Sequence, residues 1–387
     1  MVKAIKVMLI PNNVQKTKMF QYAGASRFAY NWALAREKEN YEKGGKFISD
    51  SELRKEFTKL RHSDEYAWLL NISNNVTKQA IKDACTAYKN FFKGLQKFPR
   101  FKSRKRSMPK FYQDNVKIQF SNTHVKFEGF SSSRKANKQK MNWVRLAEHG
   151  RIPTDVKYMN PRISFDGLNW WISVCVEFPD CRETLNDDGV GIDLGIKDLA
   201  ICSDGTKYKN INKSQKVKKL EKQKRRLQRS ISRSYEKNKK GESYCKTNNV
   251  IKKEKLLLKR NHRLTNIRKN YLNQTISEII NRKPRFICIE DLNVSGMMKN
   301  RHLSKAVQEQ GFFWFRKQLE YKCSDKGIQL IVADRFYPSS KLCSCCGNIK
   351  KDLKLSDRVY RCECGNMIDR DFQASINLKT YGEQFAS

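Results

Sequence analysis

The stretches VGIDLG (190–195) and LAICSDG (199–205) decide the fold of the carboxy-terminal half of this chain. Each is short and apolar, which predicts two strands joined by a tight turn. Farther along, PRFICIEDL (284–292) predicts a third strand that is buried. The other elements expected here are a strand at 328–335 and helices at 304–326 and 372–381. Strands and helices that mix in this way indicate an α/β domain.

Three of these elements carry carboxylates beside apolar residues. Asp193 lies within the first strand, Glu290 lies at the end of a later strand, and Asp371 lies at a helix start beside Asp369. A buried carboxylate without a partner is costly. If these side chains converge, they form a site for two Mg²⁺ ions of the kind that cleaves phosphodiesters. Salt-bridged or helix-capping carboxylates are the alternative, and the spacing does not decide between the two.

A cysteine cluster predicts a second metal site. Five of the twelve cysteines lie between residues 343 and 364, in the runs CSCCG and CECG. Two such pairs can close a tetrahedral thiolate site on Zn²⁺, and the absence of an open position indicates a structural role. The predicted ligands are Cys343, Cys346, Cys362 and Cys364. The second pair, Cys362 and Cys364, has one intervening residue where the usual spacing has two. Cys345 could replace a neighbouring cysteine as a ligand.

The charge balance indicates a polyanionic partner. The 387 residues include 79 Lys and Arg against 39 Asp and Glu, a formal net charge of +40. Such an excess disfavours the compact state unless a polyanion is bound, and it argues against a small-molecule substrate. No apolar run is long enough to span a membrane. The start, MVKAIKVMLIPNN, has no small-residue cleavage site, so no signal peptide is expected.

Two stretches concentrate the positive charge. Residues 95–110 carry seven Lys or Arg and no acid, with Phe98 and Phe101 interleaved. Residues 213–274 carry 22 Lys or Arg against four Glu and are expected to be helical up to about residue 282. Lys and Arg side chains bind phosphates, and aromatic rings stack on bases. The alternative is that these residues only form a charged surface exposed to solvent. The candidate nucleic-acid contacts are Lys97, Arg100, Lys102, Arg104, Lys105, Arg106, Arg225 and Arg226.

The amino-terminal half combines a sheet with helices. Residues 2–10 predict a strand, 17–42 a helix that Thr17 could cap, and 50–93 two further helices. From about residue 112 the hydrophobic period becomes two, as in the series Val116, Ile118 and Phe120. We expect an antiparallel sheet or barrel there, joined by the first strand, so that the helical block is an insertion.

The chain resembles the TnpB family, which IS200/IS605-type and IS607-type insertion sequences encode and which is regarded as ancestral to Cas12 nucleases. Its RuvC and zinc-ribbon motifs are similar to GIDLGIKDLAICSDG (191–205), FICIEDLNVSGM (286–297), RFYPSSKLCSCCG (335–347) and CECGNMIDRDFQASIN (362–377). RFAYNWAL (27–34) and FPRFKSRK (98–105) also resemble the amino-terminal half of the family.

The resemblance implies an α+β multidomain protein: a β-barrel wedge with a helical insertion, then an RNase H-like (RuvC) α/β nuclease domain with an inserted zinc ribbon. The implied domains are a wedge, 1–10 and 105–182; a helical recognition insertion, 11–104; a RuvC domain, 183–342 and 366–387, with a basic helical segment, 213–282; and a zinc ribbon, 343–365. By motif, the catalytic carboxylates and Mg²⁺ ligands are Asp193, Glu290 and Asp371. Asp371 is preferred to Asp369, although the asparagine that the family has two residues later is Gln373 here.

The implied activity is RNA-guided, metal-dependent cleavage of double-stranded DNA beside a short transposon-adjacent motif, using one RuvC site. The cofactors would be Mg²⁺, with Mn²⁺ a possible substitute, and structural Zn²⁺. The partners would be a guide RNA from the transposon end and the target DNA, at the nucleoid in a prokaryotic cytoplasm. The alternatives are a miniature Cas12 effector, an RNA-guided DNA-binding regulator or transposition accessory that does not cut, and, least favoured, a Holliday-junction resolvase.

Overall fold

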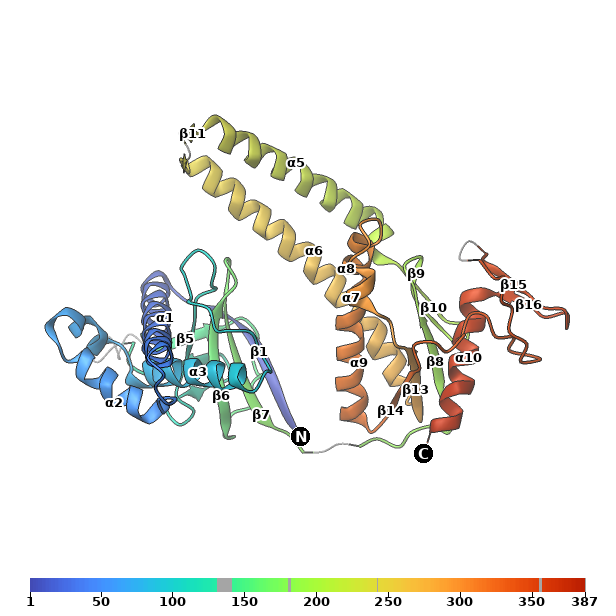
Figure 1. The fold of residues 1–387 in the computed structure, drawn as a ribbon, viewed down its shortest axis with the longest axis horizontal. Helices are drawn as coiled ribbons and strands as arrows, with labels where there is room; N and C mark the ends of the chain where they lie inside the picture. Colours follow the sequence, from blue (N-terminus) through green and yellow to red (C-terminus); the bar gives the residue numbers. More distant parts are fainter. Residues whose placement is uncertain (131–140, 180–181, 242, 355–356, 387) are drawn as a thin grey trace. The chain divides into compact units, whose positions relative to one another are not determined.

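The computed structural model describes residues 1–130, 141–179, 182–241, 243–354 and 357–386 (Figure 1). The chain forms two compact units, Met1–Pro179 and Asp180–Ser387. Each unit combines a sheet with helices, which confirms the prediction of an α+β protein. Among the described residues, no helix is long and apolar enough to cross a membrane. The finer division into wedge, insertion, nuclease and ribbon stays a prediction.

The first unit is built on a seven-stranded sheet. Its strands are β1 (Val2–Ile10), β2 (Lys110–Tyr112), β3 (Gln119–Phe120), β4 (His124–Lys126), β5 (Trp143–Leu146), β6 (Tyr158–Phe165) and β7 (Trp170–Glu177), in the order β2-β6-β7-β1-β5-β4-β3. β1 pairs antiparallel with β7, with Val7 opposite Ile172, so the first strand does join the later ones.

The sheet curls toward a barrel without closing. The rings of Phe111 in β2 and Phe127 just after β4 meet with centroids 6.4 Å apart. The Glu128 N–H also donates to the Gln113 side chain. No strand pairing joins β2 to β3 among the described residues, so the hydrogen-bonded sheet is open.

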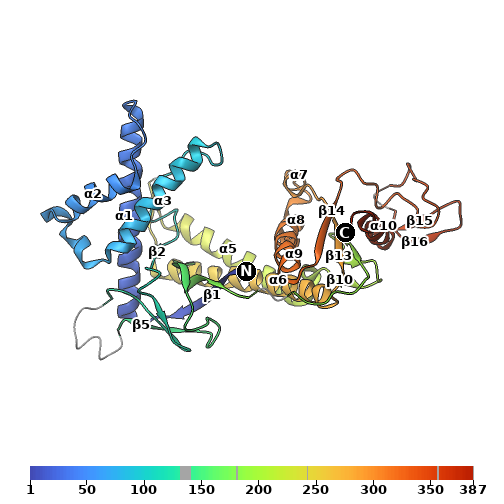
Figure 2. The same cartoon turned by 90° about the horizontal axis from the view of Figure 1, so that it is seen from below.

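The helices of this unit lie between β1 and β2, as predicted. They are α1 (Asn13–Glu42), α2 (Asp50–Arg61), the 3₁₀ helix η1 (Asp64–Asn71) and α3 (Asn74–Phe92), and Figure 2 shows α2 and α3 beside α1. The prediction that Thr17 caps the first helix is wrong. Asn12 caps it, because its side chain accepts the Gln15 N–H while the Gln15 side chain accepts the Asn12 N–H.

The strand expected around Val116 starts later than the alternating pattern predicts. The Asp114 carboxylate accepts the N–H groups of Val116 and Lys117 and closes a turn there. Val116 is therefore exposed, and β3 begins only at Gln119. The pattern was right for Ile118 and Phe120, which are buried.

The second unit has a five-stranded sheet in the order β10-β9-β8-β13-β14. Its strands are β8 (Val190–Leu194), β9 (Asp198–Cys202), β10 (Lys207–Lys209), β13 (Phe286–Glu290) and β14 (Gln329–Ala333). β9 is antiparallel to both β8 and β10, whereas β13 is parallel to both β8 and β14. All the strands predicted from the apolar runs of this half are present.

Helices cover both faces of this sheet. On one face, α6 (Asn248–Asn281) and α9 (Phe312–Lys326) pack against Ile192, Ile287 and Ile289. On the other, α10 (Arg370–Phe385) packs against Phe286 and Cys288. The helix expected at 304–326 is two helices, α8 (Ser304–Gln310) and α9, because Gly311 adopts a left-handed conformation with φ of 70°.

The basic segment is a helical hairpin. α5 (Gln215–Lys237) and α6 pack against each other, and the short strands β11 (Lys239–Lys240) and β12 (Ser243–Tyr244) lie between them in the sequence (Figure 1). The remaining elements of this unit are η2 (Ile211–Lys213), α7 (Val294–Met297), β15 (Val359–Arg361) and β16 (Met367–Asp369).

Candidate active site and metal centre

The register of two parallel strands places Asp193 beside Glu290. Ile192 of β8 is opposite Ile289 of β13, so the next residues on the two strands are neighbours at the carboxyl ends. Side chains two residues apart point to the same face of a strand. Asp193 therefore shares a face with Gly191, and Glu290 shares a face with Cys288.

That face is the one under α10. A Cβ atom added to Gly191 would lie 2.0 Å from the backbone oxygen of Ser375, so only glycine lets α10 lie this close to β8. A Cβ atom added to Gly382 would similarly collide with Phe286. The carboxyl end of α10 thus lies over the start of β13, and its first turn, which contains Asp371, lies toward the carboxyl ends of β8 and β13.

The electrostatics show that the three carboxylates lie close enough to interact. Burial raises the pKa of Asp193 well above its usual value, and the charges of Glu290 and Asp371 raise it further. Burial likewise raises the pKa of Glu290, and Asp371 adds to that effect. Carboxylates that repel each other in this way are suited to a hard divalent cation, and Asp371 is at the same time paired with Arg370 at 3.0 Å and Arg358 at 3.8 Å.

The two candidate aspartates on α10 have different surroundings. Asp369 is the N-cap, and its Oδ1 accepts the N–H groups of Asp371 and Phe372, each at 3.1 Å. Asp371 lies in the first turn, and its Oδ1 accepts from Arg370 Nη2 at 3.0 Å. Asp369 thus caps the helix and its charge also raises the pKa of Asp193, whereas Asp371 acts on both Asp193 and Glu290.

Ser339 is a residue of this site to which the sequence assigned no role of its own. Its Oγ donates to Glu290 Oε1 at 2.6 Å. The Asn377 side chain, on α10, donates to the carbonyl oxygens of Ser339 and Leu342, each at 2.7 Å. The buried Asn377 amide thus fixes the loop that carries Ser339, and Ser339 in turn orients Glu290. Its only sequence signal was its place in the polar run YPSSK before the first cysteine pair.

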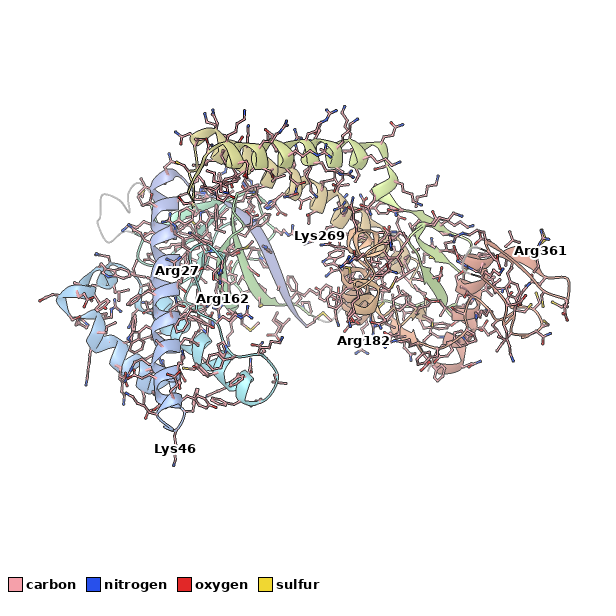
Figure 3. The ribbon with its side chains drawn as sticks, turned by 45° about the horizontal axis from the view of Figure 1, so that its top comes forward. Arg27, Lys46, Arg162, Arg182, Lys269 and Arg361 are labelled. Atoms are coloured by element: carbon pink, nitrogen blue, oxygen red, sulfur yellow. The ribbon has the colours of Figure 1, made fainter. Side chains whose placement is uncertain are left out.

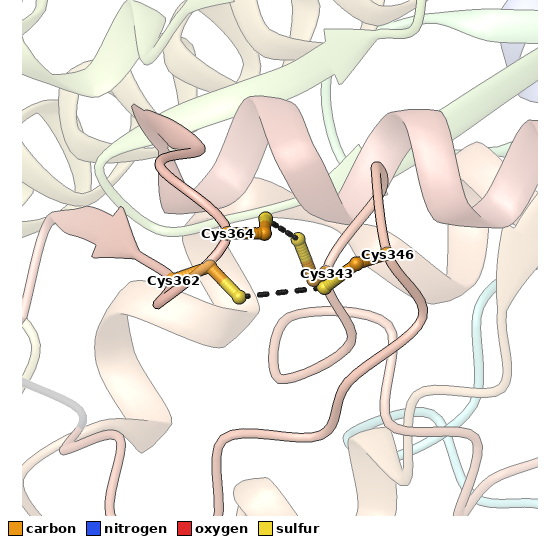
Figure 4. A group of neighbouring side chains, drawn as sticks. All are labelled: Cys343, Cys346, Cys362 and Cys364. Carbon is orange, nitrogen blue, oxygen red and sulfur yellow. Dashed lines mark hydrogen bonds between the residues drawn. The ribbon is translucent and has the colours of Figure 1, made fainter.

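The four predicted cysteines converge in the structure (Figure 4). Their sulfur atoms all lie within 4.8 Å of one another, with Cys343 Sγ 3.6 Å from Cys364 Sγ and Cys346 Sγ 3.5 Å from Cys362 Sγ. Cys345 is exposed and is not part of this group. Four sulfur donors at this spacing suit Zn²⁺.

Amide groups connect the cysteine cluster to α10. Burial opposes ionisation of Cys343, but the N–H groups of Cys346 and Cys345 and the Asn366 amide lower its pKa to about 6. The same Asn366 Nδ2 lies 3.5 Å from Cys343 Sγ and 3.0 Å from Gln373 Oε1. Gln373, two residues after Asp371, is completely buried. The cysteine cluster and the carboxylate-bearing helix are therefore joined through two amides.

The predicted basic contacts are exposed with one exception. Lys97, Arg100 and Arg104–Arg106 are exposed between α3 and β2, and Arg225 and Arg226 are exposed on α5. Figure 3 shows the side chains that project along α5 and labels Arg27 on α1 and Lys269 on α6. The surface around α5 includes a groove that Arg225, Arg226 and Arg229 line.

Lys102 is the exception, because it is half-buried. Its Nζ lies 3.0 Å from the centre of the Tyr30 ring, and its backbone N–H and C=O both bond the Asn31 side chain at 2.8 Å. Burial, with a contribution from Lys110, lowers the pKa of Lys102 to about 7. Lys102 therefore anchors the stretch 95–110 to α1, and its exposed neighbours Arg104–Arg106 line a groove with Arg27.

Comparison with known proteins gives full-length relatives. Residues 1–46 match a family model described as "Helix-turn-helix domain", 173–301 one described as "Probable transposase", and 312–378 one described as "Cas12f1-like, TNB domain". "Putative RNA-guided DNA endonuclease InsQ" of Escherichia coli (strain K12) is 31% identical over 380 residues, covering 93% of this chain and 87% of that protein.

A second relative and a solved structure also match nearly the whole chain. "Putative RNA-guided DNA endonuclease" of Streptomyces pristinaespiralis is 29% identical over 382 residues, covering 98% of this chain and 89% of that protein. Among solved structures, a chain of a "Cas12f1-sgRNA-target DNA complex" superposes with a TM-score of 0.59 at 11% identity, with 98% of each chain covered. At that identity, the likeness concerns the fold.

Proposed function

The chain belongs to the TnpB family, and from this premise we propose that it is an RNA-guided, metal-dependent DNA endonuclease with one active site. The observation that supports the proposal is the register of β8 and β13, which sets Asp193 beside Glu290, while the charge of Asp371 acts on both. Asp193 and Glu290 lie at the carboxyl ends of β8 and β13, Asp371 lies in the first turn of α10, and the charges of Glu290 and Asp371 raise the pKa of Asp193. Asp371 is paired with Arg370 and Arg358, so the adjacent charges of Asp193 and Glu290 are the part of the site that calls for a cation.

Asp193, Glu290 and Asp371 would bind Mg²⁺, for which their oxygen atoms are suitable ligands; Mn²⁺ could replace it. When bound, the metal supplies positive charge for the reacting phosphate and lowers the pKa of water. The protein contributes orientation. Ser339 fixes one oxygen of Glu290, Arg370 fixes one oxygen of Asp371, and the N-cap Asp369 fixes the start of the helix.

The sheet order supports an RNase H-like fold for the second unit. Three antiparallel strands, β10, β9 and β8, are followed by the parallel strands β13 and β14, with α10 on the carboxylate face. We assign the RuvC domain to 183–342 and 366–387, and the zinc ribbon to 343–365. Zn²⁺ on the four cysteines would be structural, since the cluster leaves no position for a substrate.

The partners we propose are a guide RNA and double-stranded target DNA. A net charge of +40 needs a polyanion, and guide pairing leaves the protein with mainly backbone contacts to make. The α5–α6 hairpin is the proposed contact for the guide or the heteroduplex. The groove between α1 and the 104–110 segment is the proposed contact for duplex DNA beside the target, because Arg27, Arg104 and Arg106 line it.

Sequencing the RNA that co-purifies with the chain tests this function. The chain should be expressed with its native flanking DNA and purified. One abundant RNA from that locus, with a variable guide at its end, is the expected result. Random RNA fragments alone would contradict guidance and would favour a DNA-binding accessory protein.

A further inference from the structure

A pocket of about 290 Å³ opens beside the carboxylates, on the side of the sheet away from α10. Glu290 forms part of its wall, and Leu194 and Ile289 at the ends of β8 and β13 form an apolar floor. Phe312, Phe313 and Arg316 come from the first turns of α9, and Arg335 comes from the segment after β14. In parallel sheets, ligands bind outside the carboxyl ends of the strands, which is where this pocket lies.

The rim of the pocket is fixed by an ion-pair network. Asp291 directly follows Glu290, the last residue of β13. Its Oδ1 accepts from Arg316 Nη1 at 2.7 Å, and its Oδ2 accepts from Arg335. Arg316 also donates to Glu320 at 3.1 Å. The carboxylates of Asp291 and Glu320 thus fix the guanidinium groups of Arg316 and Arg335, so this side of the pocket is preformed.

Phe313 gives the pocket a flat apolar face that protein packing does not use. Its neighbour Phe312 is buried in the core, whereas Phe313 is 64% exposed. The Phe313 ring therefore presents a largely exposed face at the pocket, next to Glu290. Aromatic faces of this kind bind unpaired nucleobases, and the stacking tolerates any base.

We propose that this pocket binds one unpaired nucleobase of the DNA strand being cut, next to the phosphate that reacts. The inference rests on the proposed function, which brings single-stranded DNA to Asp193, Glu290 and Asp371. The base would stack on Phe313, and the guanidinium groups of Arg316 and Arg335 would border it. Its volume of about 290 Å³ suits a single base with its sugar better than a base pair. Stacking there determines which phosphate reaches the carboxylates.

The direct test uses the full chain with its guide RNA and a matched target that carries 2-aminopurine at successive positions near the cut. Binding is followed in the Asp193→Asn background, so that the DNA stays intact. Stacking quenches 2-aminopurine, so we expect a several-fold fluorescence loss at one position. In Phe313→Leu, which keeps an apolar side chain without an aromatic face, that loss should disappear. Equal quenching in both proteins would overturn the proposal.

The matched control is Tyr321→Ala, an exposed aromatic on the same helix that does not line the pocket. In the wild-type background we expect Phe313→Leu and Phe313→Ala to cut roughly tenfold more slowly, or at several neighbouring phosphates, with guided binding unchanged. The Tyr321→Ala variant should cut normally. Unchanged rate and cut position in both Phe313 variants would overturn this inference alone. A wild-type complex that binds its target without cutting would overturn the proposed function as well.

Discussion

Ser339 shows how a neutral side chain can tune the carboxylate centre. Its hydroxyl donates to Glu290 and lowers the pKa of this buried carboxyl, against the effects of burial and Asp371. A hydrogen bond to a charged group contributes about 1.5–3 kcal/mol. The hydroxyl therefore favours the ionised form of Glu290, which is the form that binds a cation.

The Ser339→Ala variant should accordingly need more magnesium. We expect the Mg²⁺ concentration for half-maximal cutting to rise roughly tenfold, with guided DNA binding unchanged. Titration of the cleavage rate with Mg²⁺ measures this. Ser304→Ala, which loses only a 3.4 Å contact with the Arg301 carbonyl, is the control. An unaltered magnesium requirement in Ser339→Ala would mean that the hydroxyl does not orient Glu290.

Glu37 gives the first unit a pH-dependent stability. It is buried on α1, one oxygen accepts the Ile48 N–H at 3.4 Å, and burial raises its pKa from 4.5 to about 7. Between those values the folded chain binds more protons than the unfolded chain. The contribution of this carboxyl to the free energy of unfolding is therefore complete below pH 4.5 and is lost as the pH rises through 7.

The Glu37→Gln variant should remove that dependence. Its melting temperature should exceed that of the wild type at pH 8, and the difference should shrink toward pH 5, where Glu37 is protonated. Thermal unfolding at several pH values measures both proteins. If the wild type and the variant show the same pH profile, Glu37 is not the group responsible.

At the scale of elements, α10 is the helix that connects the carboxylates, the cysteine cluster and the loop of Ser339. The charge of Asp371 acts on Asp193 and Glu290, Gln373 contacts Asn366 next to the cysteine cluster, and Asn377 fixes the loop of Ser339. These residues lie on two successive turns of one helix. Disorder in the cysteine cluster should therefore reach the carboxylates through α10.

Replacing Cys343 and Cys346 together with serine tests this coupling. We expect loss of bound zinc, a lower melting temperature of the second unit and slower cutting, because the metal contributes folding free energy directly. Metal analysis and thermal unfolding give the first two results. The free thiol at exposed Cys345 provides the control, Cys345→Ser. Retention of zinc by the double variant would refute the ligand assignment.

Several elements could be predicted because their signals are local. Asp193 and Glu290 stood out as carboxylates in apolar strands, and Cys343–Cys364 showed metal-ligand spacing. The capping of α1 by Asn12 and the turn at Asp114 depended on side-chain bonds that compete with periodicity. The Phe313 pocket was not predictable, since β8, β13, α9 and the segment after β14 contribute to it from distant parts of the sequence.

At the scale of the whole molecule, the net positive charge governs how the chain binds nucleic acids. With +40 net charge and exposed arginines on both units, phosphate contacts should dominate binding. Such binding releases counterions, so affinity should fall about a thousandfold or more as salt rises from about 50 to 200 mM. Filter binding with the guide RNA at several salt concentrations measures the slope. A flat response would contradict an electrostatic interface.

The most direct test of the central claim is cleavage of a guide-matched DNA duplex by the purified complex and by its Asp193→Asn variant. The account predicts that the wild type cuts both strands only when Mg²⁺ and a matching guide are present. It predicts that the variant binds the same duplex within a few-fold of wild type and does not cut. Cutting by the Asp193→Asn variant, or binding without cutting by the wild type, would contradict it.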